Sequence, residues 1–182
     1  VFVWNAPQGD LSLSFPDHWL RQAQLNPAQD LVISHPQFVD SAHCVLEREG
    51  RTDPLINATT ILDQMHNRGS LNASIIEHRD NIAFAGRSAT MTHIGYTQSF
   101  FGQAVPMKAV QYTTRLNGDQ ISLRCASQEG RFDAHMPLFA GVAASVRSRL
   151  GSTPFPNGYY RNFLGEHVYL YQDKGRRAVS RY

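Results

Sequence analysis

The chain has 182 residues, of which 42% are hydrophobic and 18% charged, the composition of an ordinary globular protein. This length suits one domain that buries enough apolar surface to fold without a disulfide or a metal. No run of about 18 apolar residues is present, so the sequence predicts no membrane-spanning helix.

Positive charge is concentrated at the C-terminal end of the chain. Residues 152–182 hold five Lys or Arg against two Asp or Glu, a net of +3, so with a total of +2 the first 151 residues sum to −1. The same segment contains five of the seven tyrosines. This distribution argues against general nucleic-acid binding by the domain. The sequence therefore divides into an α+β domain over residues 1–151 and an aromatic, basic C-terminal extension over 152–182.

Short strands and one helix are expected in the first half of the chain. Alternating or continuous apolar residues predict three strands, at residues 11–15, 31–34 and 42–48. Asp53-Pro54 then starts a helix, because an N-cap acceptor is followed by proline at the first helical position. Arg68-Gly69 ends that helix. Further extended segments are expected at residues 75–77, 82–85 and 89–96, broken by Asp80-Asn81 and by Gly86.

The strongest local signal is a β-hairpin over residues 107–127. Asn117-Gly118 is the preferred type I′ turn, since both central residues need positive φ. Taking these two residues as the loop sets Leu116 opposite Asp119. Continuing this register outward places five residues on one face: Val110, Tyr112, Ile121, Leu123 and Cys125. The other face carries Gln111, Thr113, Arg115, Ser122 and Arg124.

A long helix is expected after the hairpin. Apolar residues that step by four and three predict it over residues 132–150: Phe132, Met136, Phe139, Ala143, Val146 and Leu150. Asp133 or His135 is the expected N-cap, because Pro137 is best tolerated near the first turn, and Gly151 is the expected end. Val168 and Leu170 indicate one more strand. This order favours an α+β fold, an antiparallel sheet flanked by helices.

Several stretches together resemble a known fold family. They are Leu11-Ser-Leu-Ser-Phe-Pro-Asp-His-Trp19, Ala42-His-Cys-Val-Leu46, Gly86-Arg-Ser-Ala89, Met107-Lys-Ala-Val-Gln-Tyr112, Ile121-Ser-Leu-Arg-Cys-Ala-Ser127 and the helix 132–150. With this order of elements, the chain resembles the Mog1/PsbP-like superfamily, including the DcrB-type and DUF1795-like bacterial proteins. The resemblance covers roughly residues 9–150, and the extension departs from a minimal domain of this type.

The resemblance implies roles that need no chemistry: extrinsic subunits of membrane complexes, a GTPase-binding factor, envelope proteins and chaperones of secreted effectors. It supplies no catalytic residues. We therefore expect a non-catalytic protein-binding domain, an accessory subunit or chaperone of a larger envelope or secretion-related assembly. Its partners would be proteins, and one option is a membrane-associated complex. We expect no binding of nucleic acid, cofactor or metal. The alternative is a hydrolase or metal-dependent enzyme whose site is assembled only in the fold, with two titratable groups in one deep pocket.

Motifs for catalysis are weak in this sequence. The eight histidines are scattered, with no HxxxH or HExxH spacing. Gly86-Arg-Ser-Ala-Thr90 lacks the second glycine of a nucleophile elbow, so Ser88 is interpreted as a strand residue after a glycine. Three acidic residues lie close together near a strand end: Glu47, Glu49 and Asp53. We interpret them as residues of a solvated loop and not as a catalytic pair. We expect no catalytic and no metal-binding residues.

Cys44 and Cys125 both fall on the apolar parity of their strands, so both should face the core. Two buried thiols and a disulfide between strands or across the sheet are equally open on this pattern, and the bridge is expected if the chain is exported. The sequence begins at Val1, which a removed signal peptide and a trimmed chain explain equally well. We expect a periplasmic or otherwise exported protein, with the cytoplasm as the alternative.

Aromatic and basic residues of the extension are the candidate docking residues, because Tyr and Arg are enriched at interface hot spots. They are Tyr159, Tyr160, Arg161, Phe163, Tyr169, Tyr171, Arg176 and Arg177. The alternative is that these aromatics cover one face of the domain's own sheet.

Overall fold

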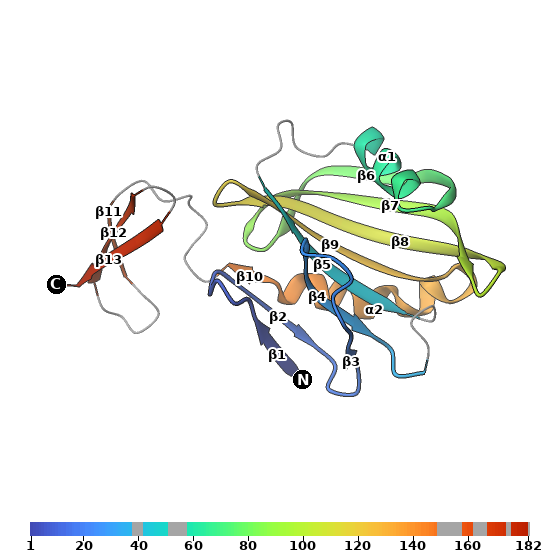
Figure 1. Cartoon of the computed structure of the whole chain (residues 1–182), viewed down its shortest axis with the longest axis horizontal. Helices are drawn as coiled ribbons and strands as arrows, with labels where there is room; N and C mark the ends of the chain where they lie inside the picture. The colour runs from blue at the N-terminus through green and yellow to red at the C-terminus, as the bar shows by residue number, and fades with distance from the viewer. Residues whose placement is uncertain (38–41, 51–57, 149–157, 162–166, 174–175, 182) are drawn as a thin grey trace.

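A seven-stranded antiparallel sheet forms the centre of this computed structural model (Figure 1). The structure describes residues 1–37, 42–50 and 58–148, and the backbone of 158–161, 167–173 and 176–181. In spatial order the strands are β3 (Leu20–Arg21), β4 (Gln29–Ser34), β5 (His43–Glu49), β9 (Asp119–Gln128), β8 (Gln103–Leu116), β7 (Arg87–Phe100) and β6 (Leu71–Phe84). A second sheet has three strands, in the order β1 (Phe2–Asn5), β2 (Leu11–Phe15) and β10 (Arg147–Ser148).

The β8–β9 hairpin has the register that the sequence predicts. Leu116 lies opposite Asp119, and Val110 lies opposite Cys125. The φ angles of Asn117 and Gly118 are 53° and 86°, which is the backbone that a type I′ turn requires. Because turn chemistry and apolar alternation agree, the two central strands of the sheet are fixed by local sequence.

The two extended segments predicted on either side of Asp80-Asn81 form the single strand β6. The register with β7 shifts between Arg79 and Ile82, and Asn81 has a φ of 58°. A β-bulge accommodates the extra residues and bends the strand without ending it. Ala85-Gly86, with φ angles of 55° and 74°, makes the predicted break as the turn into β7.

Two helices cover opposite faces of the large sheet (Figure 1): α1 (Ala58–Asn67) and α2 (Glu129–Ser145). Tyr112 and Leu123 belong to the core cluster that contains Phe139 of α2. Met107, on the other parity of β8, belongs to a second cluster with Ile61 of α1. Strand alternation thus divides the apolar residues between two cores, one beneath each helix.

The end of α1 is where the sequence predicts it. Gly69 has a φ of 81°, and the backbone N–H of Ser70 donates to the carbonyl of Met65 at 3.0 Å. This is the left-handed glycine cap that satisfies the last carbonyls of a helix. The predicted start at Asp53-Pro54 lies outside the described residues.

The predicted limits of α2 are wrong at both ends. The helix begins at Glu129, so neither Asp133 nor His135 is its N-cap, and Pro137 lies in its interior. Tertiary packing outweighs the cost of a proline inside the helix, because Phe132 and Phe139 on either side of Pro137 are buried in the core. The helix ends at Ser145 and not near Gly151, since buried Val146 is extended and the next two residues pair with β2.

The C-terminal extension contains a third sheet, with β11 (Gly158–Arg161), β12 (His167–Asp173) and β13 (Arg176–Arg181) side by side. Both of its strand pairs are antiparallel. The strand predicted around Val168 and Leu170 is β12. The strands on either side of it were not predicted, because neither has a clear alternation of apolar residues.

Candidate functional site

The polar face of the β8–β9 hairpin is buried. Gln111 is 3% exposed and Thr113 is fully buried. The Oγ1 of Thr113 lies 3.0 Å from the Oγ of Ser122, and the Nε2 of Gln111 donates to the same Oγ1 at 3.3 Å. This face of the sheet therefore offers fixed polar groups inside the protein, on the side that α1 covers.

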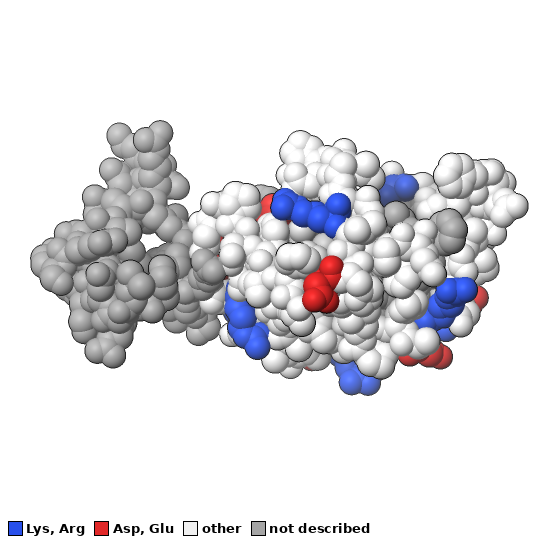
Figure 2. All heavy atoms as spheres, turned by 90° about the horizontal axis from the view of Figure 1, so that it is seen from below, with Lys and Arg blue, Asp and Glu red and all other residues white. Residues whose placement is uncertain are grey.

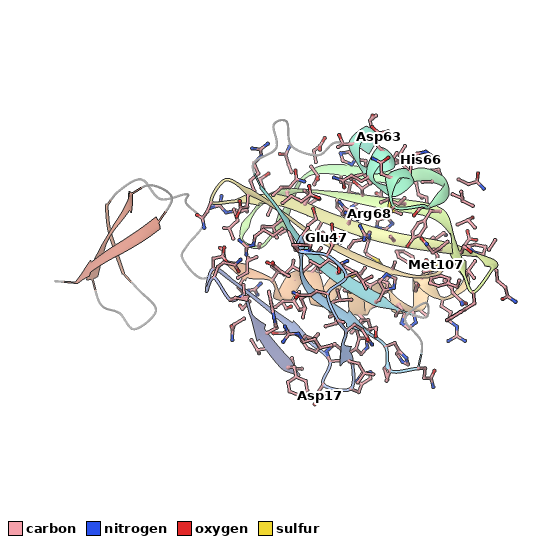
Figure 3. The ribbon with its side chains drawn as sticks, in the orientation of Figure 1. Asp17, Glu47, Asp63, His66, Arg68 and Met107 are labelled. Carbon is pink, nitrogen blue, oxygen red and sulfur yellow. A yellow bond between two sulfur atoms is a disulfide. The ribbon has the colours of Figure 1, made fainter. Side chains whose placement is uncertain are left out.

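A cavity of about 190 Å³ opens at the C-terminal end of α1 on this same face. It is lined by side chains from β5, from α1 and the turn after it, and from β7, β8 and β9: His43, Met65, Arg68, Ser70, Tyr96, Gln98, Phe100, Met107 and Arg124. Figure 3 labels Arg68 and Met107, which come from the turn after α1 and from β8. The cavity thus joins residues that are up to 81 positions apart in the sequence.

Two arginines of this cavity share one buried carboxylate. The Nη2 of Arg68 donates to the Oε2 of Glu47 at 2.7 Å, and the Nη2 of Arg124 contacts the Oε1 of Glu47 at 3.5 Å. The side chains of Glu47 and Arg124 are 8% and 14% exposed. The prediction of a solvated loop at Glu47 is therefore wrong. The physical reason is strand parity, because Glu47 lies on the face of β5 that the α1 side of the fold covers.

Burial changes the pKa of two groups in the cavity, Arg124 and Tyr96. It lowers the pKa of Arg124, an effect that Glu47 opposes and Arg68 reinforces. It raises the pKa of Tyr96, which Arg124 partly counteracts, so the phenol keeps its proton at neutral pH. The cavity therefore presents N–H and O–H donors held in place by the fold, which is an arrangement suited to recognising an anion.

The fold and this geometry can be compared with solved structures. The PsbP protein CyanoP of Synechocystis sp. PCC 6803 matches with a TM-score of 0.58 at 15% identity, over 81% of this chain and 91% of its own. The Saccharomyces cerevisiae Ran-binding protein Mog1p matches with a TM-score of 0.56 at 8% identity, over 81% and 94%. LpqN of Mycobacterium tuberculosis, involved in cell envelope biogenesis, matches with 0.51 at 14%, over 80% and 88%.

The chain has the Mog1/PsbP-like fold. The predicted α+β architecture is thereby confirmed. No family model and no curated protein matches the sequence itself, so the likeness lies in the three-dimensional structure. Neither helix of the described residues is long and apolar enough to cross a membrane.

A second charged cluster links β4, β5 and β9 of the large sheet to the turn before β2. The Nη1 and Nη2 of Arg48 donate to the two oxygens of Asp10 at 2.7 and 2.9 Å, and its Nε donates to Asp30 at 3.0 Å. Asp119 lies 3.5 Å away. Burial alone would lower the pKa of Arg48, but these hydrogen bonds outweigh burial and raise it. The four residues come from separate strands and turns, so the cluster has a structural role.

Three of the eight histidines have neighbouring rings. The ring of His35 lies 6.3 Å from that of His18 and 6.4 Å from that of His135, measured between centroids. Burial lowers the pKa of His135, and the neighbouring His35 and Arg131 add to this. Over the part of the chain that the structure describes, no three His, Cys, Asp or Glu are placed to hold a metal ion.

Ser88 lies in β7, two residues after Gly86, which agrees with its interpretation as a strand residue. The Oγ of Ser88 donates to Asn81 at 3.3 Å across the β6–β7 pair. Cys44 lies directly opposite Cys125 in the β5–β9 pair, with 4.1 Å between the Cα atoms, and the two sulfurs are bonded. Both cysteines are buried in the core beneath α2.

The predicted docking residues lie in the extension, where the structure describes only the backbone of the three strands. Seven of them fall in strands: Tyr159, Tyr160, Arg161, Tyr169, Tyr171, Arg176 and Arg177. Phe163 lies outside the described residues. Figure 2 shows one face of the domain, where Lys and Arg side chains stand apart from one another. That face does not carry the clustered cations of a nucleic-acid surface.

The cavity residues Arg68 and Arg124, and Glu47 which they contact, were not identified as a site from the sequence. Arg124 was placed on the polar face of the hairpin, and Glu47 was interpreted as part of a solvated loop. A signal was available in the run of polar residues on one face of two central strands, since central strands are covered on both faces. The pairing of β5 with β9 and the position of α1 together bring these charges into contact.

Proposed function

We propose that this chain is a non-catalytic protein-binding domain, an accessory subunit or chaperone of a larger envelope or secretion-related assembly, whose extension contacts the partner. The observation that carries the proposal is the strand pairing of the extension. In the described residues β11, β12 and β13 pair with one another and form a sheet separate from the other two. Among the described residues, the extension therefore adds no strand to either of the other two sheets.

The composition of this small sheet supports a contact surface. Its register sets Tyr159 opposite Tyr169, and Tyr171 opposite Ala178. Strand alternation then assigns the positions of Tyr159, Tyr169 and Tyr171 to one face, and those of Tyr160 and Val168 to the other. A sheet of three short strands is stable when something packs against its apolar positions. A partner protein would supply that packing.

The cavity beneath α1 supports recognition more than proton transfer. The enzymatic alternative requires two titratable groups within hydrogen-bond reach in one pocket, and Glu47 does contact Arg68. An arginine stays protonated at working pH and can only donate. Two arginines around one carboxylate therefore suit the binding of a further anionic group on a partner.

We propose an exported location because the two cysteines are bonded. A buried bond between Cys44 and Cys125 persists in oxidising compartments and is rare in the cytosol. Among the similar structures, one protein binds Ran and another is involved in cell envelope biogenesis. These activities support a binding role in general and do not name the partner of this chain.

Affinity purification from the native cell tests the proposal. The full chain is compared with a chain ending at residue 151 and with the double variant Tyr169→Ser/Tyr171→Ser. Phe101→Ser is the matched control, because Phe101 is a fully exposed aromatic residue of the β7–β8 turn. We expect truncation and the double variant to reduce partner recovery roughly tenfold or more, and Phe101→Ser to leave it unchanged. Equal recovery by the truncated chain would refute the role of the extension.

A further inference from the structure

The cavity beneath α1 holds more positive than negative charge. Arg68 and Arg124 face the single carboxylate of Glu47, which leaves the trio with a net charge of +1. Glu47 is engaged mainly by Arg68, since that contact is 2.7 Å and the contact with Arg124 is 3.5 Å. Charge-assisted hydrogen bonds are normally about 2.7–2.9 Å long. Arg124 is therefore the under-neutralised member of the trio, although it is the more deeply buried arginine.

A further anion next to Arg124 would relieve this imbalance. Burial of the guanidinium disfavours its charge and lowers its pKa, and an uncompensated buried charge is costly. A carboxylate is a planar group whose two oxygens match the donor fork of a guanidinium. Arg124 lines the cavity, so its side chain borders the space that such a group would occupy.

The size and the walls of the cavity restrict what can carry the carboxylate. A volume of about 190 Å³ is smaller than the roughly 300–1,000 Å³ of pockets for drug-sized ligands, so it suits a group of one residue. Met65 and Met107 are buried and, with Phe100, form an apolar wall. Methionine side chains adapt to apolar groups of varied shape. The ligand should therefore combine a carboxylate with an adjacent apolar group.

We propose that this cavity binds the C-terminal residue of a partner polypeptide, with its carboxylate on Arg124 and its apolar side chain against Met65 and Met107. An acidic side chain would bring the carboxylate without the apolar group. A C-terminal apolar residue brings both from one Cα atom. The inference rests on the proposed function, because it takes the ligand to be part of a protein.

The four methionines provide a direct test in the full chain. Met65 and Met107 line the cavity, whereas Met91 and Met136 pack against the core on the other face. With methionine methyl groups labelled with carbon-13, the protein is titrated with N-acetyl-leucine and with N-acetyl-leucine amide. We expect the methyl signals of Met65 and Met107 to shift with the acid and to stay unchanged with the amide. The signals of Met91 and Met136 should stay unchanged with both.

Charge variants test the role of Arg124. Arg124→Gln removes the proposed ligand, and Arg79→Gln removes an exposed arginine on β6 as the matched control. Affinity for N-acetyl-leucine should fall about tenfold or more in the first variant and stay unchanged in the second. If Arg124→Gln does not fold, the titration of the wild-type methionines still decides the question.

Three results would overturn the inference. The first is equal binding of acid and amide. The second is binding only of N-acetyl-glutamate amide, which carries its carboxylate on the side chain. The third is an absence of shifts at Met65 and Met107 in a chain that still recovers its partners through the extension, which would leave the proposed function standing. Shifts at both methionines without recovery of any partner would instead refute the protein-binding function and its protein ligand.

Discussion

Replacing Arg48 by methionine should destabilise the domain by about 3–5 kcal/mol. The change removes three hydrogen bonds and leaves Asp10 and Asp30, with side chains 4% and 12% exposed, without their cation. Removing one partner of a buried ion pair typically costs about that much, because the remaining charge stays desolvated. A domain of this size is stable by about 5–15 kcal/mol, so the loss is a large fraction of the total.

Urea unfolding followed by circular dichroism measures this loss as a shift of the midpoint at unchanged slope. Asp119→Asn is the internal comparison, since Asp119 lies 3.5 Å from Arg48 and its side chain is 39% exposed. That weaker and more exposed contact should contribute at most about 1 kcal/mol. Equal losses in the two variants, or a loss below about 1 kcal/mol for Arg48→Met, would show that the cluster does not stabilise the fold by charge pairing.

Four further measurements follow from the structure. A thiol count on denatured, unreduced protein should find Cys44 and Cys125 bonded, and reduction should cost about 4 kcal/mol; two free thiols would exclude the bond. Burial lowers the pKa of His93, so the folded chain binds this proton less readily than the unfolded chain. Stability should therefore fall as pH drops from about 7 to 5, and His93→Gln should flatten that fall in urea titrations. Phe139→Ala should cost about 3–5 kcal/mol, because the ring is fully buried beneath α2, and a loss under 1 kcal/mol would argue against this helix packing. Truncation to residues 1–151 should leave the unfolding free energy within about 1 kcal/mol; a larger loss would show that the extension packs on its own domain.

Features set by neighbouring residues were predictable from the sequence. Asn117-Gly118 fixed the register of the central hairpin, because positive φ at both positions leaves few alternatives. Gly69 marked the end of α1 for the same kind of reason. Strand parity then placed Cys44 and Cys125 on the core side, although it did not distinguish free thiols from a bond.

Features that depend on what packs against an element were decided only by the tertiary structure. The sequence around Glu47 fits a solvent-exposed strand face as well as a buried one. Glu47 is buried because the α1 side of the fold covers its face of β5. Val146 leaves α2 because the residues after it pair with β2, which is more than 130 positions earlier. Local sequence carries the preferences of a turn or a cap. The pairing of Arg124 with Glu47 depends on the long-range contacts that bring β9 and β5 together.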